Sequence, residues 1–129
     1  MSEPELPYHP PSARYLGGFP IHAVPMTRNV YSRRRKSVQD WLTALEKAAA
    51  SFAPEVTWSP DDRYVAVIEI RIPWPADIDN YIKDVLDRSA RQGVFGGQDE
   101  RVDLVHAMKR WNVAEGDAGA RMELWLLHR

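Results

Sequence analysis

The sequence predicts an α+β fold in which two helices cover a small mixed β-sheet. With 129 residues, 44% of them hydrophobic, the chain can bury one core but not two, so we expect a single domain. Apolar residues alternate in some segments and recur every three or four positions in others, as in strands and helices respectively. The segments follow one another in the order β-α-β-α-β-β, which favours a mixed sheet with both helices packed on it.

The first segments are an arm and an irregular strand. Residues 1–13 are rich in proline and are expected to form a flexible or loosely packed N-terminal arm, which leaves residues 14–129 as the folded domain. A first strand is expected at residues 15–24. Two glycines and Pro20 interrupt it, so we expect it to be irregular or to lie at an edge of the sheet.

The middle of the chain predicts a helix and then a strand. The helix is expected at residues 32–52 and ends before Pro54, because its apolar residues recur on one face. These residues are Val38, Trp41, Leu42, Leu45, Ala49 and Phe52. A half-buried strand is expected at residues 64–72, where apolar and polar residues alternate until Pro73 and Pro75 turn the chain.

The last third predicts a second helix and two strands. The helix is expected at residues 77–92, where apolar residues form a stripe, and Gly93 marks its end. Strands are expected at residues 102–113 and 120–127. A polar loop containing glycine separates them, so we expect these two strands to pair as a hairpin.

Basic residues are concentrated near the N-terminus, although the net charge is only −1. Between Glu5 and Asp40 the chain has six basic residues and no acidic one, whereas from Asp40 onward it has 16 acidic and 11 basic residues. Local charge is a better guide to nucleic-acid binding than the mean charge, so the chain remains a candidate DNA-binding protein.

Nothing in the sequence indicates a membrane protein. No apolar run approaches the roughly 20 residues that a membrane-spanning helix needs. The first residues contain acids and prolines where a signal peptide would be basic and then apolar. The absence of cysteine excludes disulfides and thiolate zinc sites. We therefore expect a cytoplasmic protein without a membrane partner.

Two aspartates at the expected start of the second helix are the main candidates for chemistry. Asp77 and Asp79 are separated by one residue and offer hard oxygen ligands that suit Mg²⁺, with Mn²⁺ as a substitute. Lys83 lies one turn beyond Asp79 on the same helix face, where its ammonium could meet a phosphate held by the metal. The ordinary alternatives are that Asp77 caps the helix and that Asp79 forms an ion pair with Lys83.

This region resembles the RusA-type Holliday junction resolvase family. The family is marked by Asp-x-Asp-Asn-x-x-Lys-x-x-x-Asp, then a glycine turn, then Asp-Asp-x-x-Val at the start of a strand. The matching residues here are Asp77, Asp79, Asn80, Lys83, Asp87, Gly93, Asp99, Val102 and Lys109. The segment at residues 25–31 is similar to a further family segment, with Thr27 in place of a serine.

The resemblance implies a magnesium-dependent endonuclease that resolves Holliday junctions and similar branched DNA by paired phosphodiester hydrolysis. By this resemblance the metal ligands are Asp77, Asp79 and Asp99, the fourth catalytic residue is Lys83, and the supporting residues are Asn80 and Asp87. Asp87 is equally suited to an ion pair with Arg91 on the helix surface. A four-way junction is two-fold symmetric and needs two nicks, so we expect a homodimer.

The third metal ligand remains open between two neighbouring residues. Where the family has two adjacent aspartates, this chain has Gln98 before Asp99, and its glycine turn is one residue longer. Alignment on Val102 selects Asp99, whereas a shift by one residue would select Glu100.

Basic residues near the first helix are candidate DNA contacts. The helix macrodipole disfavours cations at a helix N-terminus, and a DNA phosphate would offset that cost. The ordinary alternative is a solvated basic surface. The candidate DNA-binding residues are Arg28, Asn29, Arg33, Arg34, Arg35, Lys36 and Lys109.

Two other functions compete with this interpretation. A RusA-like protein with an altered acidic pair could bind branched DNA with weak or no cleavage. A haloacid-dehalogenase-type phosphatase also carries Asp-x-Asp after an apolar strand. Here four residues separate Ile72 from Asp77, and the chain is too short for the repeated α/β units of such an enzyme.

Overall fold

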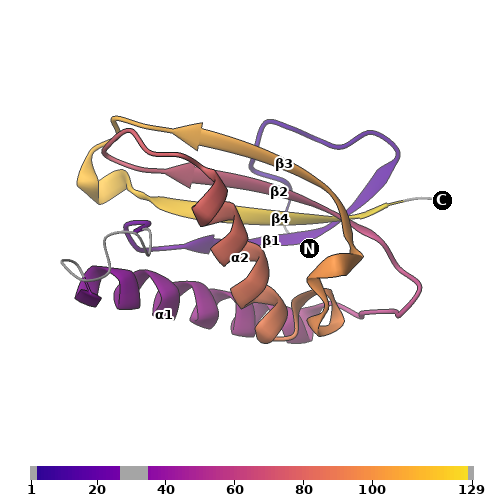
Figure 1. Cartoon of the computed structure of the whole chain (residues 1–129). Helices are drawn as coiled ribbons and strands as arrows, with labels where there is room; N and C mark the ends of the chain where they lie inside the picture. Colours follow the sequence, from indigo (N-terminus) through magenta and orange to yellow (C-terminus); the bar gives the residue numbers. More distant parts are fainter. Residues whose placement is uncertain (1–2, 27–34, 128–129) are drawn as a thin grey trace.

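A computed structural model of the chain describes residues 3–26 and 35–127. It confirms the α+β class, with one four-stranded mixed sheet and two helices (Figure 1). The sheet has the strand order β1-β4-β2-β3. The strands are β1 (Ala13–Ile21), β2 (Tyr64–Arg71), β3 (Val102–Arg110) and β4 (Gly119–Leu127), and the helices are α1 (Arg35–Phe52) and α2 (Asp79–Arg91). No helix in the described part of the chain has both the length and the apolar character needed to cross a bilayer.

The predicted hairpin of the last two strands is wrong. β4 lies between β1 and β2 and is antiparallel to both, whereas β3 pairs in parallel with β2, for example Ala107 beside Ile68. α2 connects the end of β2 to the start of β3, and parallel neighbours require such a crossover. β3 ends at Arg110, earlier than expected, because Asn112 adopts a left-handed φ of 62° and turns the chain.

β1 is an irregular edge strand, as its glycines and proline predicted. Its register against β4 shifts between Tyr15 and Gly17. Gly17 has φ of 140°, and a Cβ at Gly18 would lie 2.8 Å from the carbonyl oxygen of Met122. These two positions therefore need glycine, one for its conformation and one for the close approach of β4.

Both helices pack on one face of the sheet, where they form the main core (Figure 1). From α1, Trp41 and Leu45 are fully buried, as the three- and four-residue spacing predicted. Every residue of β2 is buried except Arg71, which is partly exposed. β2 is therefore covered on both faces, and its end is a rigid base for the turn that follows it.

The N-terminal segment covers the other face of the sheet. Leu6 is 5% exposed and packs with Val67 and Trp125, and the ring of Tyr8 stacks on that of His106 with centroids 3.8 Å apart. The expectation of a loosely packed arm is therefore wrong for these residues. Proline-rich composition suggested an arm, but the few large apolar side chains within it fix it to the sheet.

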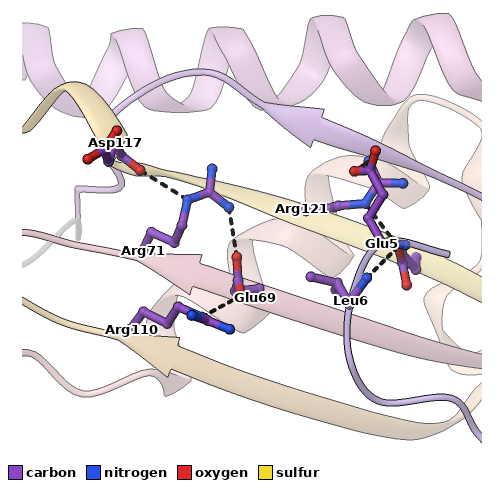
Figure 2. A network of polar contacts seen from close by, with 8 residues as sticks. Glu5, Leu6, Glu69, Arg71, Arg110, Asp117 and Arg121 are labelled. Atoms are coloured by element: carbon purple, nitrogen blue, oxygen red, sulfur yellow. Dashed lines mark hydrogen bonds and ion pairs between the residues drawn. The ribbon is translucent and has the colours of Figure 1, made fainter. Parts of the chain in front are cut away.

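Buried carboxylates anchor this face (Figure 2). Glu123 is fully buried, and its Oε2 accepts hydrogen bonds from the backbone N–H groups of Glu5 and Leu6 at 2.7 and 3.1 Å, and from Arg121 Nε at 2.9 Å. Farther along the same face, Glu69 accepts hydrogen bonds from two arginines, Arg71 and Arg110, at 2.8 Å each. These contacts offset part of the cost of burying the two carboxylates, although the buried Oε1 of Glu123 has no hydrogen-bond partner among the described residues.

Glu123→Ala should lower the free energy of unfolding by about 3 kcal/mol, because it leaves the arginine and two backbone donors buried without their acceptor. Urea unfolding measures this loss. The matched control is Glu5→Gln, which removes only the ion pair between the largely exposed Glu5 carboxylate and Arg121 and should cost less than about 1 kcal/mol. Equal small losses in both variants would contradict the anchoring role of Glu123.

Candidate functional site

The candidate site is the acidic turn, residues 77–79, between β2 and α2. After β2, Pro73, Trp74 and Pro75 redirect the chain, and α2 then begins at Asp79. The residue at the N-cap is Ile78, and no side chain caps the helix. Asp77 therefore does not act as the helix cap, and the side chains of Asp77 and Asp79 are both exposed to solvent.

Lys109 lies against this turn from the neighbouring strand. Its Nζ donates a hydrogen bond to the carbonyl oxygen of Ala76 at 2.6 Å. The ammonium is therefore held one residue from Asp77, although the two residues are 32 positions apart in the sequence. The parallel register that places Lys109 beside Ile70 brings it there.

Aromatic side chains fix the start of α2. Tyr81 is 1% exposed, and burial raises its pKa above the ordinary value, while a hydrogen bond with Trp74 lowers it in part. The phenol therefore stays neutral and joins the first turn of the helix to the segment before it. We did not single out Trp74 or Tyr81 from the sequence, although the position of Trp74 between two prolines was a signal.

The polar residues of α2 divide into exposed groups and paired groups. Asn80 and Lys83 are exposed, and the ion pairs among the described residues include none between Asp79 and Lys83. Asp87 instead pairs with Arg91, Oδ2 to Nη2, at 3.3 Å, which is the ordinary alternative considered for it. Lys83 thus points into solvent one turn beyond Asp79, where it can contact an incoming anion.

The structure places Asp99 and Glu100 at the other end of α2. They belong to the short helix η4 (Asp99–Arg101), just after Gly97, where an added Cβ would lie 3.7 Å from the carbonyl oxygen of Ala90. Figure 1 shows this short helix beside the C-terminal end of α2, away from the start of α2.

The pairing of β3 with β2 shows how far Asp99 and Glu100 lie from the acidic turn. Val102 pairs with Tyr64 and Lys109 pairs with Ile70, so the two ends of β3 are about 20 Å apart along the sheet. Within the part of the chain that the structure describes, no three acidic, histidine or cysteine side chains gather into a group that could hold a metal. One chain therefore brings Asp77 and Asp79 together but does not add Asp99 or Glu100.

Arg63 holds the acidic end of β3. Its Nε donates to Asp103 Oδ1 at 2.8 Å and its Nη2 donates to the carbonyl oxygen of Glu100 at 2.7 Å. The hydrogen bond with Asp103 raises the pKa of Arg63, and the nearby charges of Asp103 and Glu100 act in the same direction. No local pattern predicts these contacts, because the partners of Arg63 are 40 and 37 positions away in the sequence.

Most of the candidate DNA-binding residues lie outside the described part of the chain. These are Arg28, Asn29, Arg33 and Arg34, and nothing is described of the side chain of Arg35. Lys36 lies in the first turn of α1, exposed, with its Nζ 3.2 Å from Asp40 Oδ2. The position of Lys36 at a helix start agrees with the sequence prediction.

A cavity connects the start of α1 to the segment before the acidic turn. It has a volume of about 360 Å³, and its lining includes Ser37 and Asp40 of α1 together with Trp74. Lys36 precedes Ser37, and Trp74 lies three residues before Asp77. The basic end of α1 and the acidic turn therefore lie at the same end of the molecule.

The sequence matches no protein-family model and no curated protein. The chemistry of the site therefore has to be argued from its donor atoms. Mg²⁺ keeps several waters and commonly binds through one or two carboxylates together with substrate phosphates. Asp77 and Asp79, exposed on one turn, fit such a site without a third protein ligand, and water and phosphate can take the remaining positions.

Asp79→Asn should weaken Mn²⁺ binding at least tenfold, which corresponds to about 1.4 kcal/mol, because it removes one charged ligand. The free ion can be followed by electron paramagnetic resonance during a titration. Asp61→Asn, which replaces an exposed aspartate in a turn remote from α2 in the sequence, is the matched control and should bind Mn²⁺ as the unmodified chain does. Equal weakening in both variants would show that the ion is held only by the general negative charge.

Proposed function

We propose that this protein is a magnesium-dependent endonuclease that cuts branched DNA, in line with its resemblance to RusA-type resolvases. The observation that carries the proposal is the acidic turn itself. Two exposed carboxylates stand at the start of a helix, with Lys109 held against the same turn and Lys83 one turn farther along α2. Carboxylates that bind a metal, flanked by cations that bind phosphate, are what phosphodiester hydrolysis requires.

In this proposal each residue has a defined task. Asp77 and Asp79 hold the ion, which when bound polarises the scissile phosphate and lowers the pKa of a coordinated water. Lys83 orients the phosphate, and the N-terminus of α2 adds a favourable field for its negative charge. Asn80 offers an amide beside the two carboxylates. The products expected from the resemblance carry a 5′-phosphate and a 3′-hydroxyl.

The distribution of charge supports a DNA path across this end of the molecule. Lys36, the last residue of the basic run in the sequence, lies in the first turn of α1, beside the cavity shared with Trp74. A phosphate bound by Lys36 would lie near the acidic turn, where a second phosphate could reach Lys109 and Lys83. Binding by such contacts depends on salt but carries little sequence information, as suits an enzyme that selects DNA by its shape.

A second candidate function is branched-DNA binding with weak or no cleavage. It is favoured by the position of Asp99, which within the chain lies about 20 Å from the acidic turn along β3. A site with two carboxylates could bind an ion too weakly for catalysis. Cleavage assays separate this candidate from the first, because both predict junction binding.

A labelled synthetic four-way junction should be nicked in the presence of Mg²⁺ and left intact in EDTA, whereas a linear duplex of the same sequence should be cut poorly. Lys83→Ala should slow junction cleavage by about 10²-fold, because it removes a charge that stabilises the transition state. Lys47→Ala, at an exposed lysine of α1, is the matched control and should cut normally. Junction binding without any cleavage would favour the second candidate, and no preference for the junction would contradict both.

A further inference from the structure

Trp111, just after β3, exposes its indole ring to solvent. The sequence contains five tryptophans, all within the described part of the chain. Trp41 and Trp125 are buried, and Trp58 and Trp74 are partly buried, whereas Trp111 is 57% exposed. Packing of the core therefore does not account for the place of this ring, which leaves its apolar face available to a partner.

The backbone around Trp111 is fixed to the core. The N–H of Ile72 donates to the carbonyl oxygen of Arg110 at 2.9 Å, and the carbonyl oxygen of Ile72 accepts from the N–H of Val113 at 3.4 Å. Trp111 and Asn112 lie between these two hydrogen bonds, and Asn112 has the left-handed φ of 62°. Because Ile72 is fully buried, the exposed ring stands on a rigid support and loses little backbone entropy when it binds.

This place is beside the acidic turn. β2 and β3 end at the same side of the molecule, where the chain leaves β2 toward α2 (Figure 1). Lys109, two residues before Trp111, reaches the carbonyl oxygen of Ala76 with its Nζ. The side chain of Arg110 is 61% exposed, although its Nε is bound to Glu69. An aromatic ring beside cations suits nucleic acid, whose phosphates bind the cations and whose bases stack on the ring.

An open base face is available to such a ring at a branch point and not inside a linear duplex. Within a duplex each base is covered on both faces by its neighbours, and uncovering one costs about as much as a stack on tryptophan returns. At a four-way branch point, the base pairs that border the centre lose a neighbour when the arms separate. A fixed tryptophan can stack there without the cost of breaking a base stack.

We propose that Trp111 stacks on a base at the branch point and thereby selects branched over linear DNA. This inference rests on the proposed function and adds a residue that determines which DNA structure is bound. With the base on Trp111, the neighbouring phosphates lie within the part of the surface that holds Lys109 and the acidic turn. The same contact that recognises the branch therefore places a phosphate at the candidate metal site.

Binding assays with two variants test this role. In EDTA, which prevents cleavage, Trp111→Ala should weaken junction binding about tenfold, because one base–aromatic stack is lost. Trp111→Phe keeps an aromatic face and should bind the junction within about threefold of the unmodified chain. A linear duplex of the same sequence should bind all three proteins alike. Circular dichroism confirms that each variant is folded.

The indole N–H signals in ¹H–¹⁵N NMR spectra report on the stack itself. The signal of Trp111 is assigned by its absence from the spectrum of Trp111→Phe. Addition of the junction should shift that signal upfield, because a stacked base shields the indole by its ring current. Addition of the duplex should leave the signal close to its position in the free protein.

The inference would be overturned if Trp111→Ala weakened junction and duplex binding equally, or weakened neither, or if the junction left the indole signal unmoved. A lower sedimenting mass of Trp111→Ala with unchanged junction binding would assign the ring to a protein interface and overturn it as well.

The proposed function can fail separately. A junction that is bound through Trp111 but never cut in Mg²⁺ would end the proposed nuclease and support the stack. Normal junction cleavage by a Trp111→Ala variant with unchanged binding would support the nuclease and end the stack. A chain that bound neither DNA would contradict both.

Discussion

The parallel pairing of β3 with β2 determines where the charged groups of this molecule lie. Since both strands run in the same direction, the chain must return along α2 to the opposite end of the sheet before β3 begins. The turn that enters α2 therefore lies at the C-terminal end of β2, and the turn that leaves α2 lies at the N-terminal end of β3. Asp77 and Asp79 are on the first turn, and Asp99 and Glu100 are on the second.

The same pairing brings Lys109 to the acidic turn and leaves the far side of β3 open. A site built in this way has two carboxylates and a nearby lysine, and the further carboxylates lie about 20 Å away along β3. The open edge and the divided acidic residues are thus two consequences of one connection. An antiparallel hairpin of β3 with β4 would have produced neither.

Sequence patterns predicted the positions of the helices and strands better than they predicted which strands pair. Helical spacing located α1 and α2, and the alternation from Tyr64 located β2, because burial on one face leaves a local periodic signal. The strand partners could not be predicted, since the same alternation suits any neighbour. The residues of the site were predicted to a similar extent. Local spacing identified Asp77 and Asp79, whereas the contact of Lys109 with Ala76 depends on how β3 pairs with β2 and could not be predicted.

Paramagnetic broadening by Mn²⁺ in ¹H–¹⁵N NMR spectra tests most directly whether the acidic turn is the metal site. The account predicts that the amide signals of residues 76–80 broaden first. Signals from the other acidic segments, residues 61–62 and η5 (Glu115–Asp117), should remain sharp at the same Mn²⁺ concentration. Broadening centred on either of those segments, with residues 76–80 unaffected, would contradict the account.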